Sequence, residues 1–175
     1  MRFTLVIAAP LAALVALTVP ETAFAAVDAY LYIEGVKGDA TDARHRDWIE
    51  ISSFQWGVGR GISSPMGGSA DRESSAPSVS EIVVTKTSDR ASPLLSRCAA
   101  TACHYRSAVL EMRRPGGDNR MTRYMLSNVI IGGYHMSSGG DRPTESLSIN
   151  FTKIEMLAAP AILQFTACGA AILEV

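Results

Sequence analysis

The sequence has few of the features that usually carry chemistry. Of its 175 residues only three are cysteine and three are histidine. It contains no CxxC pair, no paired-histidine zinc spacing, no GxSxG or HExxH motif, and no phosphate-binding or calcium-binding loop. We therefore expect no enzymatic activity, no metal ion and no cofactor, and we assign no catalytic, cofactor-binding or metal-binding residue.

A strong charge of either sign is also missing. Lys and Arg number 16 and Asp and Glu number 17, which gives a formal net charge of -1. A chain without a basic field is a poor candidate for binding nucleic acid. Near-zero net charge gives little self-repulsion, so it permits self-association.

One long apolar run stands at the N-terminus. Met1 and Arg2 precede an apolar stretch to Val19 that contains Pro10, and small residues end it near Ala25. This pattern predicts a signal peptide over residues 1–25, cleaved after Ala25, and a secreted or periplasmic mature chain without a membrane span. A membrane anchor is the alternative, but the run is short for one and proline interrupts it.

The cysteines do not form an even set. Cys98, Cys103 and Cys168 are an odd count, so no disulfide framework follows. Cys98 and Cys103 fall five residues apart in an expected helix, on different faces, and we expect no bridge between them. Cys98 is expected to be a small buried residue.

The remaining histidines and acidic residues lack useful partners in the sequence. His45, His104 and His135 are scattered, so each is expected to be a surface or packing residue. The acidic residues of the loop at 38–46 and its end lack the frame of a calcium site, and solvated charge is the expectation for them; they are Asp39, Asp42 and Asp47.

Strands dominate the expected secondary structure. Alternating or β-rich segments predict strands over 29–36, 48–58, 79–87, 108–113, 121–131 (extending past a Gly132–Gly133 bend to 137) and 145–156. In the last of these, Leu147, Ile149 and Phe151 share a core-facing side and the polar residues share the other. The strand over 48–58 is apolar on both faces, so one face is expected to meet a helix or a neighbouring subunit.

One helix is expected in the mature chain. Ser92 as N-cap and Pro93 at the first helical position predict its start. Its apolar face comprises Leu94, Leu95, Cys98, Ala99 and Ala102. Several short strands and a single helix predict a mainly β fold, a small barrel or sandwich with one flanking helix.

Two segments have no clear periodicity. Residues 59–78 are rich in Ser and Gly and predict a long irregular loop, of a length that is typical of functional or disordered loops. The apolar tail over 157–175 leaves three interpretations open: a final strand, an oligomer contact, or a divergent end. The domain boundaries are therefore a signal peptide over 1–25, a barrel domain over 26–156 and the tail.

Several blocks in fixed order resemble the haemolysin-coregulated protein (Hcp) family, the inner-tube proteins of type VI secretion. The resemblance covers about residues 27–156 and is carried by segments 28–38, 48–57, 85–94, 141–145 and 150–154. The matching positions are Gly35, Lys37, Gly38, Trp56, Gly57, Ser92, Pro93, Asp141, Arg142, Pro143, Thr144 and Glu145.

The resemblance implies a small β-barrel of two antiparallel sheets with a flanking helix, assembled as a hexameric ring that stacks into a tube. The implied partners are further copies of the chain, the type VI sheath and spike, and small effector proteins carried in the lumen. The long loop corresponds to the family's extended loop, which contacts a neighbouring ring or subunit. Its suspected stacking residues are Gly61, Pro65, Met66, Gly67, Gly68 and Arg72.

A second interpretation remains open. Tube-building members of the family are loaded in the cytoplasm and lack a cleaved signal, whereas residues 1–25 predict export. The alternative is therefore an exported periplasmic or secreted β-barrel binding module with the same fold and no role in the secretion machine.

Overall fold

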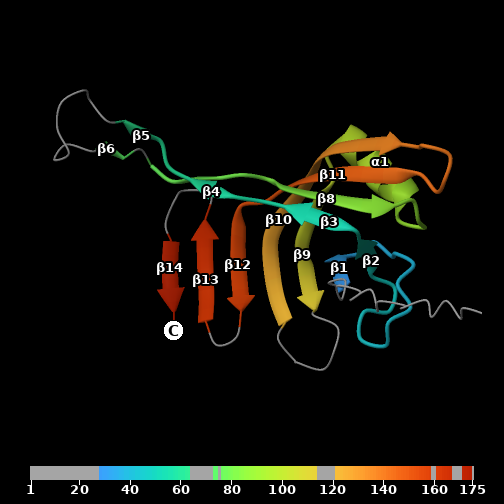
Figure 1. Ribbon diagram of the computed structural model, residues 1–175, viewed down its shortest axis with the longest axis horizontal. Coiled ribbons are helices and arrows are strands. Elements are labelled where there is room, and N and C mark those ends of the chain that lie inside the picture. Colours follow the sequence, from blue (N-terminus) through green and yellow to red (C-terminus); the bar gives the residue numbers. More distant parts are fainter. Residues whose placement is uncertain are drawn as a thin grey trace, which may run out of the picture.

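The longest strand, β10 (Met121–Ser137), has neighbours along both of its edges (Figure 1). The structure is a computed structural model that describes residues 28–63, 73–74, 76–113, 121–158, 161–166 and 171–174, with only the backbone described for 62–63, 73–74, 161–166 and 171–174. The other elements are β1 (Asp28–Ile33), β2 (Ile49–Ile51), β3 (Ser53–Gln55), β4 (Val58–Gly59), β5 (Ile62–Ser63), β6 (Glu73–Ser74), β7 (Ser78–Val79), β8 (Ile82–Thr87), α1 (Ser92–Thr101), β9 (His104–Arg113), β11 (Thr144–Asn150), β12 (Lys153–Ala158), β13 (Ala161–Thr166) and β14 (Ala171–Glu174).

The sheet is antiparallel throughout and divides around β10. Strand β9 pairs along one edge, and the other edge carries β12 beside residues 122–127 and β11 beside residues 130–137. The expectation of one strand over 145–156 is therefore wrong at its middle. The strand breaks at Thr152, whose backbone N–H and hydroxyl both donate to the Ser127 carbonyl, at 3.1 and 3.2 Å. The break directs the two halves to different neighbours, β8 and β13.

A second break lies at Ser52. The expected strand over 48–58 is divided into β2, which pairs with β1, and β3, which pairs with β8. Between them the Ser52 N–H donates to the Thr85 carbonyl at 2.8 Å. The bend explains why both faces of this segment are apolar: Ile51 before it and Phe54 after it both contribute to one core.

The core follows the expected alternation. Leu147 and Ile149 are fully buried, Phe151 is partly buried and packs against the core, and Ser146 and Ser148 lie on the opposite face. Leu31 and Ile33 of β1 contribute fully buried side chains in the same way. The Gly132–Gly133 bend is confirmed as a register shift in β10, which continues to Ser137.

Helix α1 covers the barrel at one end and packs against β10 (Figure 1). Leu95 and Cys98 are buried and Leu94 and Ala99 partly buried, so the expected apolar face is confirmed for these four residues. Ala102 is exposed and lies beyond the helix. The N-cap is Ala91 and not Ser92, because the Ser92 hydroxyl turns inward to the Asp89 N–H and to Lys86.

Residues 59–78 are not irregular where they are described. Strand β4 pairs with β7, and β5 pairs with β6, so the segment forms two short antiparallel ribbons in succession. We call these ribbons the arm. In Figure 1 the arm extends away from the barrel, with β5 and β6 farthest from it.

The apolar tail continues the sheet as strands. Strand β13 pairs with β12, and β14 pairs with β13, both antiparallel. The sequence left open a final strand, an oligomer contact or a divergent end. The backbone of the tail forms two strands, where the first of these interpretations expected one. Strand β14 stands at the edge of the described sheet (Figure 1).

Candidate assembly surfaces and buried polar clusters

The root of the arm is held by aromatic packing and by backbone hydrogen bonds. Trp56 is partly buried and meets Tyr124 edge-on, with ring centroids 5.6 Å apart. Gly57 and Ser80 exchange two hydrogen bonds, at 2.8 and 2.9 Å. Trp56 and Gly57, two of the positions matched by the family resemblance, therefore fix where the arm leaves the barrel.

Beyond its root, side chains described in the arm are exposed to solvent. Val58 is 43% exposed and Gly61 is exposed. Of the suspected stacking residues only Gly61 lies within the described residues. The other five lie outside them: Pro65, Met66, Gly67, Gly68 and Arg72.

The turn at 141–145 and the segment leading into α1 form one junction. The Ser88 N–H donates to the Pro143 carbonyl at 2.8 Å, and the Arg142 guanidinium donates to the Ser88 carbonyl at 2.9 Å. Thr144 and Glu145 pair with Thr87 and Lys86 across β11 and β8. The structure thus brings together two of the blocks that carry the family resemblance, although more than 50 residues separate them.

A buried lysine holds this junction together. Lys86 and Glu145 are fully buried, and the lysine Nζ lies 2.7 Å from Glu145 Oε2 and 2.8 Å from Asp89 Oδ1. The same ammonium donates to the Ser92 hydroxyl at 3.1 Å. We call these four residues the Lys86 cluster. The cluster is not visible in the sequence, because its members approach one another only when β8, β11 and the start of α1 are assembled.

Charge and burial set the protonation of this cluster. Burial would raise the pKa of Glu145, but hydrogen bonds, led by the one from Lys86, outweigh it and hold that pKa below its ordinary value. Burial and the neighbouring Glu145 raise the pKa of Tyr134 to about 12. Glu145 is therefore ionised and Tyr134 neutral at physiological pH.

His45 forms the second buried polar cluster. Its side chain is 2% exposed, with Nδ1 2.7 Å from Asp42 Oδ1 and Nε2 2.7 Å from Glu111 Oε2. Tyr30 stacks on the imidazole with centroids 4.2 Å apart, and Arg123 pairs with the other Glu111 oxygen. Each histidine was expected to be a surface or a packing residue. His45 is a packing residue, and His104 and His135 are surface residues.

The loop that carries His45 is tied down along its length. Arg90 pairs with Asp39 and with Asp47, the latter at 2.9 Å, and its guanidinium also donates to the Gly38 carbonyl. The hydrogen bond from Arg90 lowers the pKa of Asp47, and the one from His45 lowers the pKa of Asp42. The three carboxylates are partly exposed or exposed, as expected for solvated charge, and each also has a cationic or histidine partner.

Glycine is required at one matched position of this loop. A Cβ added at Gly38 would collide with the backbone of Trp48 and Ile49. Gly35, which has a φ of +81°, forms the turn after β1. Lys37, between them, is largely exposed and lies 3.7 Å from Asp47. The matched Gly-Val-Lys-Gly segment therefore shapes the loop rather than a ligand site.

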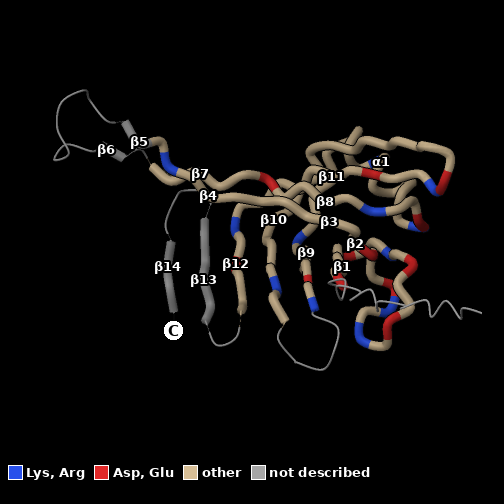
Figure 2. The backbone as a smooth tube through the Cα atoms, in the orientation of Figure 1, with Lys and Arg blue, Asp and Glu red and all other residues tan. Residues whose placement is uncertain are grey.

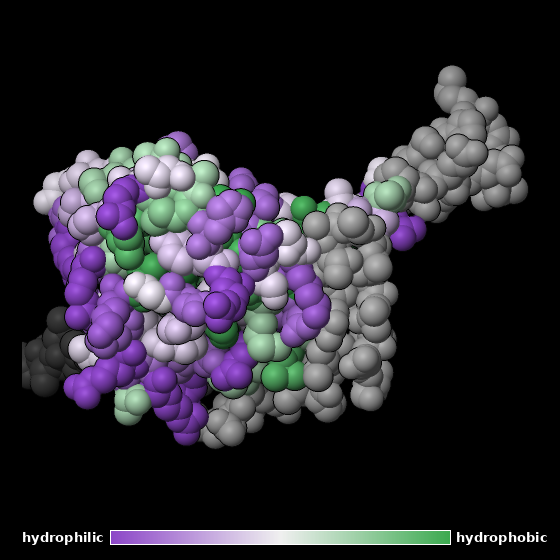
Figure 3. Space-filling model, turned by 180° about the vertical axis from the view of Figure 1, so that it is seen from behind, coloured by the Kyte–Doolittle hydropathy of each residue, from purple (hydrophilic) through white to green (hydrophobic). Residues whose placement is uncertain are grey.

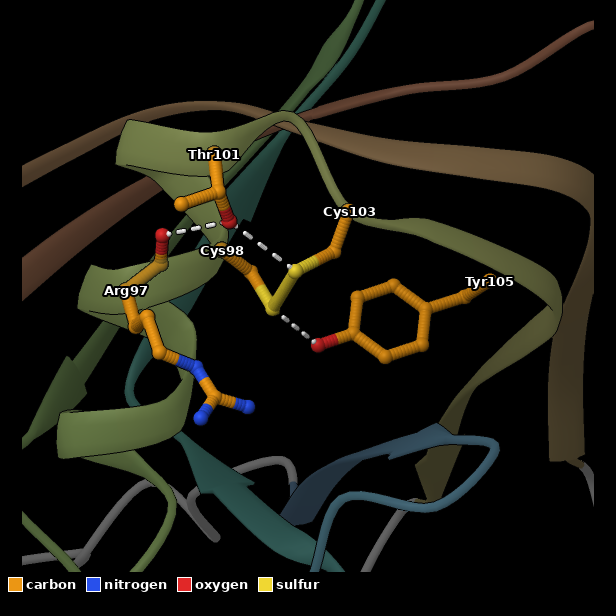
Figure 4. The surroundings of a disulfide bond; sticks show 5 residues. All are labelled: Arg97, Cys98, Thr101, Cys103 and Tyr105. Carbon is orange, nitrogen blue, oxygen red and sulfur yellow. Dashed lines mark hydrogen bonds between the residues drawn. A yellow bond between two sulfur atoms is a disulfide. The ribbon is translucent and has the colours of Figure 1, made fainter.

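The expectation of no bridge between Cys98 and Cys103 is wrong. The two residues form a disulfide, with Cα atoms 4.8 Å apart (Figure 4). Helix α1 ends at Thr101, and Ala102 adopts the left-handed conformation with φ 50° and ψ 48°. This residue reverses the chain before Cys103, so the two cysteines do not occupy successive faces of one helix.

The described residues present no metal site. They contain no group of three or more His, Cys, Asp or Glu side chains that could hold a metal ion. A recess of about 180 Å³ lies between the loop and the junction, and it is lined by Asp39, Ala40, Glu50, Thr87, Asp89 and Arg142. Among the described residues no helix has the length and apolar character needed to cross a membrane.

The described surface is mixed. Figure 2 shows charged residues of both signs gathered around the loops near β1 and β2 and around the junction. Seen from behind, hydrophilic residues cover much of the described face and hydrophobic residues show in patches between them (Figure 3). The buried charged groups are used within the two polar clusters, and the extended feature of the surface is the arm. These features define a structural β-barrel subunit.

Comparison with known proteins identifies the family. Residues 30–157 match the family described as the type VI secretion system effector Hcp. The chain is 30% identical over 138 residues to Protein hcp1 of Pseudomonas aeruginosa, covering 75% of this chain and 82% of that protein. The chain therefore belongs to the Hcp family, and it is a ring- and tube-forming structural protein of the type VI secretion system.

Solved structures agree on the fold. The crystal structure of Hcp1 from Salmonella typhimurium superposes with a TM-score of 0.71 at 22% identity, over 84% of this chain and 99% of that one. That of a type VI secretion system effector from Yersinia pestis gives 0.61 at 20% identity, over 84% and 100%. The resemblance drawn from the sequence and the expected fold class are confirmed.

Proposed function

We propose that this chain forms hexameric rings that stack through the arm, with the lumen sheltering small effector proteins. The single observation that carries the stacking role is the arm itself. Two successive ribbons extend from the barrel, and Trp56 and the Gly57–Ser80 hydrogen bonds fix their direction. Exposed paired strands held at a fixed angle are suited to contacting another subunit.

The chain is proposed to act without catalysis. The family is one of structural tube proteins. In addition, the buried Lys86, Glu145, His45 and Glu111 of the described chain are held by hydrogen bonds or ion pairs to one another or to nearby carboxylates. Side chains held this way are engaged within the fold, because removing one partner would leave the other buried and uncompensated.

Export is the second part of the proposal. Hcp proteins are secreted components of their system. Residues 1–25 have the charge, apolar core and small-residue end of a signal peptide, so we propose cleavage after Ala25 and a periplasmic or secreted mature ring. Sheath and spike proteins and effector cargo are the proposed partners in a secretion machine.

Negative-stain electron microscopy of the mature chain tests the assembly. Hexameric rings, alone or stacked, are expected, and a chain lacking residues 65–76 should give single rings without stacks. Size-exclusion chromatography of both proteins at equal concentration provides the control for ring formation. Loss of rings in the deletion, or unchanged stacking, contradicts the role given to the arm.

An exported binding module without a machine role is the second candidate, favoured by the predicted leader. Under that alternative the mature wild-type chain is a featureless monomer in the same images. Micrographs of the wild type therefore separate the two candidates before any variant is made.

A further inference from the structure

The disulfide joins two elements that turn away from each other. Cys98 lies in the last turns of α1, and Cys103 directly precedes β9, which pairs with both β1 and β10. The Cys103 N–H donates to the Cys98 carbonyl at 3.3 Å across the left-handed Ala102. The backbone therefore already holds the two Cα atoms within the range that a disulfide requires.

The two sulfur atoms differ in access. Cys98 is 1% exposed and packs in the core, whereas Cys103 is half-buried. The Tyr105 hydroxyl donates to Cys98 Sγ at 2.8 Å, and the Thr101 hydroxyl lies 3.3 Å from Cys103 Sγ (Figure 4). An incoming protein thiol or disulfide would meet Cys103 first.

The position in the helix argues against a catalytic redox pair. Catalytic CxxC pairs stand where a helix N-terminus stabilises the thiolate, which makes the pair easy to reduce. Here the pair stands at a helix C-terminus, whose partial negative charge disfavours a thiolate. Such a pair is stable once oxidised and serves structure.

We infer that Cys98 and Cys103 are a substrate site for a thiol–disulfide oxidoreductase outside the cytoplasm, with Cys103 the first cysteine to react. The compartment in this inference rests on the proposed export, while the order of reaction rests on the structure alone. Disulfides persist in secreted and periplasmic proteins and are rare in the reducing cytoplasm.

The inferred reaction is a thiol–disulfide exchange between the two cysteines and the disulfide of the oxidoreductase. The Cys103 thiolate attacks the partner's disulfide, forming a mixed disulfide and releasing the partner's other sulfur as a thiolate. The Cys98 thiolate then attacks the Cys103 sulfur and releases the partner's second thiolate. The chain loses two protons and two electrons, and the partner's disulfide becomes a dithiol.

Thiol labelling of the full chain, leader included, tests the compartment. All samples carry Cys168→Ser, so that only the pair is counted, and cells are lysed in denaturant with N-ethylmaleimide before intact-mass measurement. Periplasmic protein is expected to take no label before reduction and two labels after it. The variant Leu14→Arg, whose altered leader retains the protein in the cytoplasm, should take two labels without reduction. The protein with the unaltered leader should do the same in a host that lacks its periplasmic thiol oxidase. Equal labelling in all three samples overturns the inference.

Trapping tests the order of reaction. Cys98→Ser should accumulate a mixed disulfide with the oxidoreductase through Cys103, and the matched Cys103→Ser should accumulate far less. The reverse ratio overturns the assignment of Cys103.

A purified sample separates a failed site from failed export. The reduced full chain carrying Cys168→Ser, treated with oxidised glutathione, should close to the intramolecular disulfide and retain no glutathione. A persistent adduct or an unreacted dithiol overturns the site itself. If the purified chain forms the disulfide but the chain in cells is cytoplasmic and reduced, both the inferred compartment and the proposed export are overturned.

Discussion

Lys86 and Glu145 stand 59 residues apart in the sequence and meet with no solvent exposure on either side chain, Nζ to Oε2 at 2.7 Å. The pair lies where β8 and β11 are hydrogen-bonded neighbours, and Asp89 adds a second carboxylate to the same ammonium. One cation is therefore shared between two carboxylates, so the two partners of the pair are not equivalent.

Removing the lysine should cost more than removing the glutamate. Lys86→Met leaves two carboxylates facing each other in the core, which is expected to lower the free energy of unfolding by about 3–5 kcal/mol. Glu145→Gln leaves the ammonium paired with Asp89, and a loss of about 1–3 kcal/mol is expected. Urea denaturation measures both values. Equal losses would show that Asp89 does not share the charge.

Acid should weaken the same junction in a defined direction. The pKa of Glu145 lies below its ordinary value in the folded chain, so its contribution to stability is complete above the unfolded pKa of about 4.3 and is lost as the pH falls through the lower folded value. The free energy of unfolding of the wild type should therefore fall more steeply than that of Glu145→Gln as the pH is lowered from about 5 to about 3, a range that spans the unfolded pKa. Parallel curves for the two proteins contradict the shift.

The strand pattern was predictable because it depends on local alternation. Leu147 and Ile149 were expected in the core and are fully buried. The breaks within the expected strands were not predictable. The one at Thr152 depends on the Ser127 carbonyl of β10, and the one at Ser52 depends on the Thr85 carbonyl of β8. Both acceptors are brought there only by the assembled sheet.

The disulfide shows the same limit. The five-residue spacing excluded a bridge only if the helix continued through Cys103. Ala102 ends it in a left-handed conformation that a non-glycine residue adopts only occasionally, and no glycine marks the position in the sequence. The Lys86 cluster was likewise hidden: Ser92 and Glu145 were singled out by the family resemblance, but their shared cation joins them only through tertiary contacts.

Two matched glycines should respond differently to the same substitution. Gly38→Ala places a methyl group against the backbone of Trp48 and Ile49, which cannot yield as a side chain would, whereas a Cβ at Gly57 meets nothing within 4 Å. We expect Gly38→Ala to lower the free energy of unfolding by about 1–3 kcal/mol. Gly57→Ala should stay within about 0.5 kcal/mol of the wild type. Thermal and urea unfolding of the pair provide the comparison, and a neutral Gly38→Ala would mean that the loop is free to move away from β2.

The histidine at the centre of the second cluster should be coupled to its glutamate partner. His45→Phe preserves an aromatic ring against Tyr30 but leaves Glu111 Oε2 without its buried donor, and we expect a loss of about 1–3 kcal/mol. Glu111→Leu alone leaves the imidazole Nε2 without its partner and also removes the partner of Arg123. In the double variant neither orphaned group remains, so the two losses should fall short of additive by about 1 kcal/mol or more.

The matched control is His104, which is exposed at the start of β9. His104→Gln should change the free energy of unfolding by no more than about 0.5 kcal/mol. A double-mutant cycle by urea denaturation at pH 7 measures the coupling. Strict additivity of His45→Phe and Glu111→Leu would mean that the 2.7 Å contact carries no net stabilisation.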